Sequence, residues 1–235
     1  MATAFWIVDQ QYVGEAVNSA VSVRNHMPDV RRILFSPDPV YVNSVFDEIR
    51  RLPTRQHKWW YIDSSHYFGL AVEGIKDDKL LYFDSDTFMC EPIYDVLELL
   101  GRYDIAATHA PGRITSKALD PLEIPEAFPE VNVGVMGVSR SVYTIWLMQR
   151  WHDEFRKNPD RYNNNDQGPL RKVLWENRGI NLYILPPEYN CRWGFGGFAR
   201  YRVKVLHGRS KNYAGVCNRL NEKAVMRGWD RGEVN

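Results

Sequence analysis

The sequence predicts an α/β fold in which a mixed, mostly parallel central sheet is flanked by helices. Apolar runs without polar alternation occupy residues 5–8, 32–36, 79–83 and 105–108, as expected of strands that are buried on both faces. Apolar residues at helical spacing follow the first run, at 13–27, and precede the third, at 65–76. Because parallel strands need such crossovers, this alternation indicates a doubly covered sheet.

The remaining elements extend the same pattern. Apolar spacing predicts a helix over 42–49, ended by Pro53, and a helix over 94–100, closed by Gly101. Residues 59–62 fit a strand, although their paired tryptophans can equally cap a helix or line a cleft. Further strands are expected at 132–138, 181–185 and 203–206, and further helices from Ser139 or Ser141 to 158, from about 167 to 175, and over 218–227. Residues 110–129 show no period and contain several prolines, which favours a lid or acceptor loop.

Length and charge limit the classes of protein that are possible. The 235 residues suit one domain over 1–213, with a C-terminal helix and tail over 214–235 packed on or trailing it. A net charge of +1 gives no overall electrostatic field that would attract nucleic acid. No leader and no transmembrane window is evident. The three cysteines are odd in number and lack CxxC spacing, which favours a reducing compartment, so we expect a cytoplasmic protein.

Two carboxylates one residue apart, Asp84 and Asp86, end the run at 79–83. Open α/β sheets bind ligands at the carboxyl ends of their strands, and two close carboxylates repel each other unless a cation or proton compensates them. The pair therefore fits a divalent metal site, an acid/base pair or a solvated strand end. A phosphatase that uses Asp-x-Asp requires Thr or Val where this chain has Phe88, which weakens that reading.

The chain resembles the GT-A glycosyltransferases that use nucleotide sugars, and within them the family-eight enzymes related to glycogenin and the bacterial galactosyltransferases. The resemblance runs from residue 5 to about 213. Its pieces follow one another in the order of that family, namely Val8-Asp9-Gln10-Gln11-Tyr12, Asp84-Ser85-Asp86-Thr87, Asn132-Val133-Gly134, Asp166-Gln167, Leu185-Pro186-x-x-Tyr189-Asn190 and His207-Gly208-Arg209-Ser210-Lys211-Asn212-Tyr213.

This resemblance implies a Mn²⁺ or Mg²⁺ ion held by Asp84 and Asp86, because a divalent cation neutralises the leaving nucleoside diphosphate. It also implies a metal ligand in His207 and a phosphate contact from Lys211 after Gly208. Two residues usually separate that histidine from the glycine, whereas His207 directly precedes Gly208. A histidine that caps or packs at a strand end is the alternative for His207.

The resemblance places Val8, Asp9 and Tyr12 around the base, with Ser85 beside the metal pair. Tyr12 can stack on a base or pack as a helix staple. Arg55 and Lys58 either contact phosphate or form a solvated basic turn.

Around the donor sugar the resemblance places Asn132, Asp166 and Gln167, with Asp166 and Gln167 as the catalytic pair. The family retains anomeric configuration, by a front-face route or through a covalent intermediate on a carboxylate such as Asp166. Both residues also suit simple helix capping. Trp193 can line an acceptor site, but a core role is more common for tryptophan.

The implied activity is transfer of a sugar, most plausibly UDP-linked, to a hydroxyl acceptor. The alternatives are a nucleotide- or glycan-binding homologue without turnover and a sugar nucleotidyltransferase. The chain lacks the glycine-rich N-terminal loop with which nucleotidyltransferases cradle a triphosphate.

Overall fold

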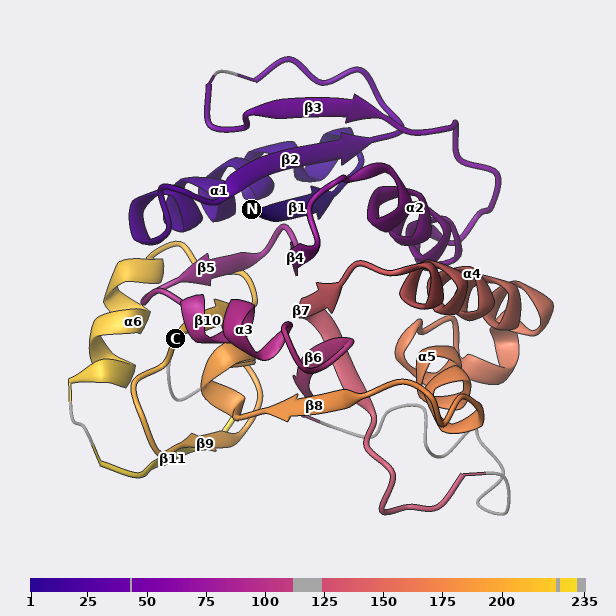
Figure 1. Cartoon of the computed structure of the whole chain (residues 1–235). Coiled ribbons are helices and arrows are strands. Elements are labelled where there is room, and N and C mark those ends of the chain that lie inside the picture. The colour runs from indigo at the N-terminus through magenta and orange to yellow at the C-terminus, as the bar shows by residue number, and fades with distance from the viewer. Residues whose placement is uncertain (43, 112–123, 223–224, 232–235) are drawn as a thin grey trace.

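A computed structural model describes residues 1–42, 44–111, 124–222 and 225–231. Its centre is a seven-stranded sheet in the order β3-β2-β1-β4-β7-β6-β8 (Figure 1). Strand β7 runs antiparallel to its neighbours β4 and β6, and the other pairs are parallel. The carboxyl ends of β1 and β4 therefore meet the amino end of β7 at one edge. The strands are β1 (Ala2–Ile7), β2 (Arg31–Ser36), β3 (Glu48–Arg51), β4 (Lys79–Phe83), β6 (Ile105–His109), β7 (Val131–Ser139) and β8 (Leu182–Leu185).

Helices cover both faces of this sheet, as the buried apolar runs predict. Alternate residues of one strand enter different cores, so that Phe5 of β1 packs with helices α2, α4 and α5, whereas Trp6 packs with α1 and α3. Helices α2, α4 and α5 gather on the right of Figure 1. The helices are α1 (Val13–His26), α2 (Trp60–Gly74), α3 (Tyr94–Leu99), α4 (Val142–Lys157), α5 (Gln167–Glu176) and α6 (Tyr213–Asn221), with short 3-10 turns at Gln10–Tyr12, Pro159–Tyr162 and Pro187–Asn190.

A smaller unit of structure lies beside the carboxyl edge of the sheet. Strand β5 (Thr87–Met89) pairs antiparallel with β10 (Val205–His207), and β9 (Gly197–Ala199) pairs with β11 (Arg227–Trp229). Helix α6 packs on this unit through a separate apolar cluster that includes Trp193, Leu206 and Val216. Residues on both sides of position 213 thus share one core.

Cys90 and Cys217 form a disulfide, and Cys191 is buried and free. The odd cysteine count and the missing CxxC spacing, which favoured a reducing compartment, gave no sign of this pair. The two partners are 127 residues apart in the sequence. They meet because α6 packs beside the end of β5, which no spacing rule detects. The cysteine count consequently gives no support to a cytoplasmic location.

Several predicted elements are confirmed with their boundaries. Ser141 caps α4, since its hydroxyl accepts from the Thr144 amide while the Thr144 side chain accepts from the Ser141 amide. Helix α5 starts at Gln167, as expected.

Three predicted elements were wrong. Residues 42–49 contain no helix among those described, because Asp47 pairs with Arg32 through backbone and side chain and leads into the edge strand β3. Residues 59–62 begin helix α2 instead of forming a strand, and Trp59 occupies the N-cap position, which was the alternative. The last helix was predicted over 218–227, whereas α6 spans Tyr213–Asn221 and the strand β11 follows it.

Residues 112–123, most of the stretch for which we predicted a lid or acceptor loop, lie outside the described residues. Within the described residues, no helix combines the length and the apolar character needed to cross a bilayer.

Candidate metal centre

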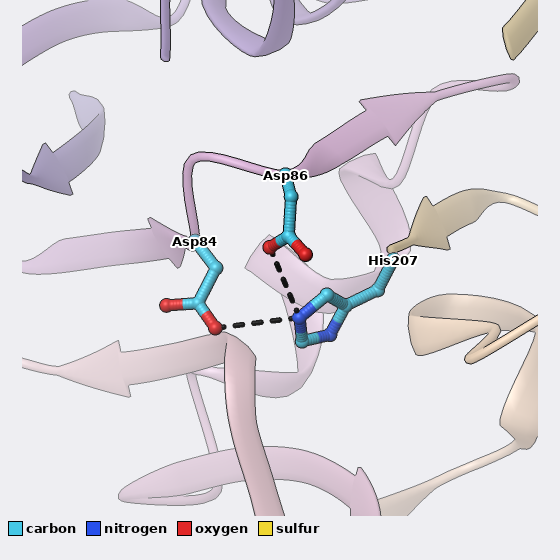
Figure 2. A group of neighbouring side chains, drawn as sticks. All are labelled: Asp84, Asp86 and His207. Carbon is cyan, nitrogen blue, oxygen red and sulfur yellow. Dashed lines mark ion pairs between the residues drawn. The ribbon is translucent and has the colours of Figure 1, made fainter. Parts of the chain in front are cut away.

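Asp84, Asp86 and His207 come together at the carboxyl end of β4 (Figure 2). The Nε2 atom of His207 lies 3.3 Å from Oδ2 of Asp84 and 3.4 Å from Oδ1 of Asp86, and one ligand atom from each residue falls within 4.8 Å of the others. The His207 side chain is 2% exposed, while those of Asp86 and Asp84 are 18% and 35% exposed. The group is thus open to the solvent on its carboxylate side.

A tight turn and a strand pair fix this geometry. The Thr87 hydroxyl and amide both donate to the Asp84 carbonyl, closing the turn that carries the two carboxylates. In the pairing of β5 with β10, His207 lies opposite Thr87, and the Gly208 amide donates to the Asp86 carbonyl. The spacing of His207 from the glycine in the sequence therefore does not prevent it from reaching the carboxylates.

Gly134 of β7 leaves the room that this group occupies. A Cβ atom at that position would lie 2.0 Å from Cε1 of His207 and 2.7 Å from Oδ2 of Asp84, closer than real side chains approach. The absence of a side chain at Gly134 is therefore a condition for the three ligands to meet.

A hydrogen-bonded chain sets the orientation of the imidazole. The Gly134 amide donates to Oδ1 of Asn132, and Nδ2 of Asn190 donates to the same oxygen at 2.8 Å. The amide oxygen of Asn190 then faces Nδ1 of His207 at 2.8 Å. The ring consequently turns Nε2 toward the carboxylates, as outer partners of metal-binding histidines do.

The electrostatics of this group favour an ionised Asp86. Burial raises the pKa of Asp86, but hydrogen bonding and charge from His207, with Arg192 and Arg209 nearby, outweigh it and lower the pKa to about 2. Burial lowers the pKa of His207, and its bonds with Asp84 and Asp86 more than offset this and raise it.

The three residues line a cleft of about 550 Å³ that joins the edge of the sheet to the smaller unit. Other walls come from β1, the start of α2, the start of α5 and the segment after Cys191. Predicted site residues that line this cleft are Val8, Asp9, Tyr12, Arg55, Lys58, Asp84, Ser85, Asp86, Asn132, Asp166, Gln167 and His207.

Asp166 and Gln167 form the wall at the start of α5. The Asp166 side chain makes no capping bond, so helix capping does not account for it; Oδ1 of Asn165 accepts from the Gln167 amide instead. Asp166 is 7% exposed, and burial together with the charge of Asp84 raises its pKa to about 7. Oε1 of Gln167 is buried and has no hydrogen-bond partner among the described residues.

Asp9 and Tyr12, which follow β1, also line the cleft. Oδ2 of Asp9 accepts from Gln11, whereas Oδ1 is buried and finds no partner in the described part of the chain. The guanidinium of Arg209 lies over the Tyr12 ring at 5.1 Å. Val8 is buried beneath them, and the Ser85 hydroxyl donates to Glu15.

Lys211 does not line the cleft. It lines an adjoining hollow of about 700 Å³ at the start of α6, together with Arg209 and Arg219. Gly208 adopts φ +130°, a backbone conformation that favours glycine, at the bend between this hollow and the metal centre. Trp193 is 4% exposed and packs in the smaller core, so its core interpretation is the correct one.

The sequence reasoning missed several side chains of the site, four of which matter for its chemistry. Arg192, Arg209 and Tyr61 line the cleft, and Asn190 orients His207. Asn190 stands inside the Leu185-Pro186-x-x-Tyr189-Asn190 motif, which was the available signal. For the other three no spacing pattern points to the site, since the tertiary contacts alone bring them there.

Comparisons with known proteins match this chain by structure and not by sequence. Neither the protein-family models nor the curated protein sequences give a match. The galactosyltransferase LgtC in complex with donor and acceptor sugar analogues has a TM-score of 0.64 at 13% identity, covering 90% of this chain and 88% of that one. An active-site mutant of LgtC has a TM-score of 0.64 at 14% sequence identity, with 94% of each chain covered.

The glycosyltransferase GlyE of Streptococcus pneumoniae TIGR4 has a TM-score of 0.63 at 17% identity, covering 97% of this chain and 58% of that chain. The chain has the GT-A fold of these glycosyltransferases. Identities this low establish the fold alone, because one fold supports many activities.

Proposed function

We propose that the protein is a metal-dependent glycosyltransferase that moves a sugar from a nucleoside diphosphate, most plausibly UDP, to a hydroxyl acceptor with retention of configuration. The observation that carries this proposal is the Asp84–Asp86–His207 group at the carboxyl edge of a GT-A sheet. That edge is where open α/β sheets bind ligands.

The donor set fits Mn²⁺, or Mg²⁺ in its place. Two carboxylates and one imidazole nitrogen are ligands for a divalent ion of this type, and the low pKa of Asp86 keeps that ligand ionised at neutral pH. Asn190 holds His207 with Nε2 toward the carboxylates. When bound, the ion supplies Lewis-acid stabilisation of the leaving diphosphate.

Unsatisfied polar atoms in the cleft support a bound nucleotide sugar. Oδ1 of Asp9 and Oε1 of Gln167 are buried acceptors without partners in the described residues, and both residues line the cleft. Buried acceptors are normally satisfied, so both suit hydrogen-bond donors of a ligand. In this proposal Asp9 and Tyr12 face the base of the nucleotide. The diphosphate is contacted by Arg55, Lys58 and Arg209 in place of Lys211, which lines the adjoining hollow.

Asn132, Asp166 and Gln167 face the donor sugar in this proposal. Asp166 is a carboxylate with no capping duty, which leaves it available to attack the sugar face opposite the leaving group. Gln167 orients the sugar through its amide. Retention of configuration, read from the product by NMR, tests this part.

The test of the activity is a donor-hydrolysis and transfer assay with Mn²⁺ over a panel of UDP-sugars. Asp84→Asn and Asp86→Asn remove a ligand charge while keeping the side-chain shape, and we expect each to abolish turnover. Asp153→Asn, a half-exposed carboxylate on α4, is the matched control and should keep full activity. Unchanged rates in the two site variants contradict the metal role. Tight UDP binding without turnover of any donor favours a binding homologue instead.

A further inference from the structure

Arg192 occupies the side of His207 that faces the two carboxylates. Its Nη1 atom lies 2.6 Å from Nε2 of His207, nearer than either Asp84 or Asp86, whose oxygens are 3.3 and 3.4 Å away. Arg192 follows Cys191 on the segment that forms one wall of the cleft. A permanent cation therefore stands at the nitrogen that the metal centre needs.

The hydrogen-bonded chain from β7 decides which nitrogen of His207 presents its lone pair to Arg192. A backbone amide can only donate, so Oδ1 of Asn132 accepts from Gly134 and also from Nδ2 of Asn190. The Asn190 oxygen must then accept a hydrogen bond from the Nδ1–H group of His207. Arg192 can only donate to Nε2, because a guanidinium has no lone pair to offer. Arg192 therefore uses the lone pair of Nε2 and brings a positive charge beside the two carboxylates.

Nε2 of His207 has one lone pair, and that pair cannot serve Arg192 and a metal ion together. Two cations at one small site also repel each other strongly. We propose that Arg192 is a displaceable counter-cation: it holds the metal-free centre together, leaves Nε2 when a divalent ion binds, and then binds the diphosphate of the donor. This inference rests on the proposed function, since it assumes the metal centre and a nucleotide donor.

The surroundings of Arg192 suit the second position. The side chain lines the same cleft as Asp9, Arg55 and Lys58, and its guanidinium lies over the Phe195 ring at 5.0 Å. Its Nε is buried and finds no partner among the described residues, so one donor is already unpaired. A guanidinium matches phosphate oxygens in a bidentate way, and the release of Arg192 would place such a group beside the leaving diphosphate.

The proposal makes metal and nucleotide affinities move in opposite directions when Arg192 is changed. In Arg192→Gln, Mn²⁺ titrated without nucleotide should bind about fivefold tighter or more, because no cation has to be displaced. UDP titrated at saturating Mn²⁺ should bind about tenfold weaker, because a phosphate contact is lost. Calorimetry measures both, and the electron paramagnetic resonance of free Mn²⁺ gives an independent reading of the first. Arg200→Gln, at an exposed arginine of the same segment, is the control and should change neither.

The outcomes separate this inference from the proposed function. Equal Mn²⁺ affinity in wild type and Arg192→Gln overturns the proposal that Arg192 is a counter-cation. It leaves the proposed metal centre unaffected. Weaker Mn²⁺ binding in Arg192→Gln, with an unchanged melting temperature in EDTA, shows that Arg192 supports the ion and also overturns it. Mn²⁺ binding by neither protein overturns the metal centre and the proposed function with it.

Discussion

The cleft holds two carboxyl groups, those of Asp86 and Asp166, in opposite electrostatic conditions. Asp86 lies beside His207, Arg192 and Arg209, and its pKa is lowered to about 2. Asp166 is buried without such a partner and feels the charge of Asp84, so its pKa is raised to about 7. One cleft therefore carries a carboxylate that is always ionised and a carboxyl group that titrates near neutrality.

This difference assigns separate tasks to the two groups. Environments that push two pKa values apart are the usual way in which one site supports two chemical roles. The ionised Asp86 suits metal binding, and Asp166 suits a step in which a carboxylate acts on the sugar once it has lost its proton. The predictions below test whether this division is real.

The largest effect is expected from Asp166→Asn on transfer. If Asp166 attacks the sugar, the amide cannot replace it, and kcat should fall by on the order of a thousandfold or more. UDP affinity in the presence of Mn²⁺, measured by calorimetry, should stay the same because Asp9 and the metal centre are unchanged. Asp160→Asn, at an exposed aspartate on the preceding 3-10 turn, is the control. A loss of less than about tenfold would instead favour a front-face route without a carboxylate nucleophile.

The same substitution should stabilise the metal-free protein, whereas Asp86→Asn should destabilise it. For Asp166, a raised pKa means that the folded state holds its proton between about pH 4 and 7 while the unfolded chain has lost it, so stability falls as pH rises through this window. Because Asp166→Asn removes that cost, it should raise the free energy of unfolding by up to about 4 kcal/mol above pH 7.

For Asp86 the sign is reversed. Its lowered pKa contributes stability that is present above about pH 4 and is lost as pH falls toward 2, so Asp86→Asn should cost about 2 kcal/mol at pH 7. Denaturant unfolding of both variants in EDTA from pH 3 to 8 checks the pair. If the unfolding free energy changed with the same sign in both variants, the electrostatic contrast between Asp86 and Asp166 would be contradicted.

Gly134→Ala should remove the metal centre without touching a ligand. The new methyl group would take the place of the His207 ring and of Oδ2 of Asp84, so we expect Mn²⁺ affinity to fall by about a hundredfold. Gly14→Ala is the control, because nothing lies within 4 Å of a Cβ there and α1 should gain about 0.5–1 kcal/mol. Normal Mn²⁺ binding in Gly134→Ala, seen by calorimetry, would show that the ion does not require the observed positions of these ligands.

The smallest effect is expected from Asn190→Leu, which keeps the approximate volume and removes the bond to Nδ1 of His207. Loss of such an outer partner usually weakens metal binding by about tenfold to a hundredfold, and we expect the lower end because the β5–β10 pairing still holds His207 opposite Thr87. A Mn²⁺ titration checks this. Unchanged affinity would mean that the β5–β10 pairing alone orients His207.

Much of the site follows from residues that end strands. The buried runs at 5–8 and 79–83 predict strands whose carboxyl ends carry Asp9, Asp84 and Asp86, and these residues do line one cleft. Prediction failed where apolar residues had no single period, as at 42–49, where the contacts of Asp47 with Arg32 led into an edge strand. It also failed for the Cys90–Cys217 pair, whose partners are distant in the chain.

The sequence by itself determined the alternating α/β order and the carboxylate pair at the end of a buried strand, because buried strands and their polar ends leave a local pattern. The motifs at Asn132 and Asp166 came from the resemblance to the GT-A glycosyltransferases. The tertiary structure alone decided that His207 meets Asp84 and Asp86, that Arg209 and not Lys211 enters the cleft, and that Arg192 stands at Nε2. These contacts depend on how β5, β10 and the Cys191 segment pack together. Distances across such a packing are not encoded in the spacing of residues along the chain.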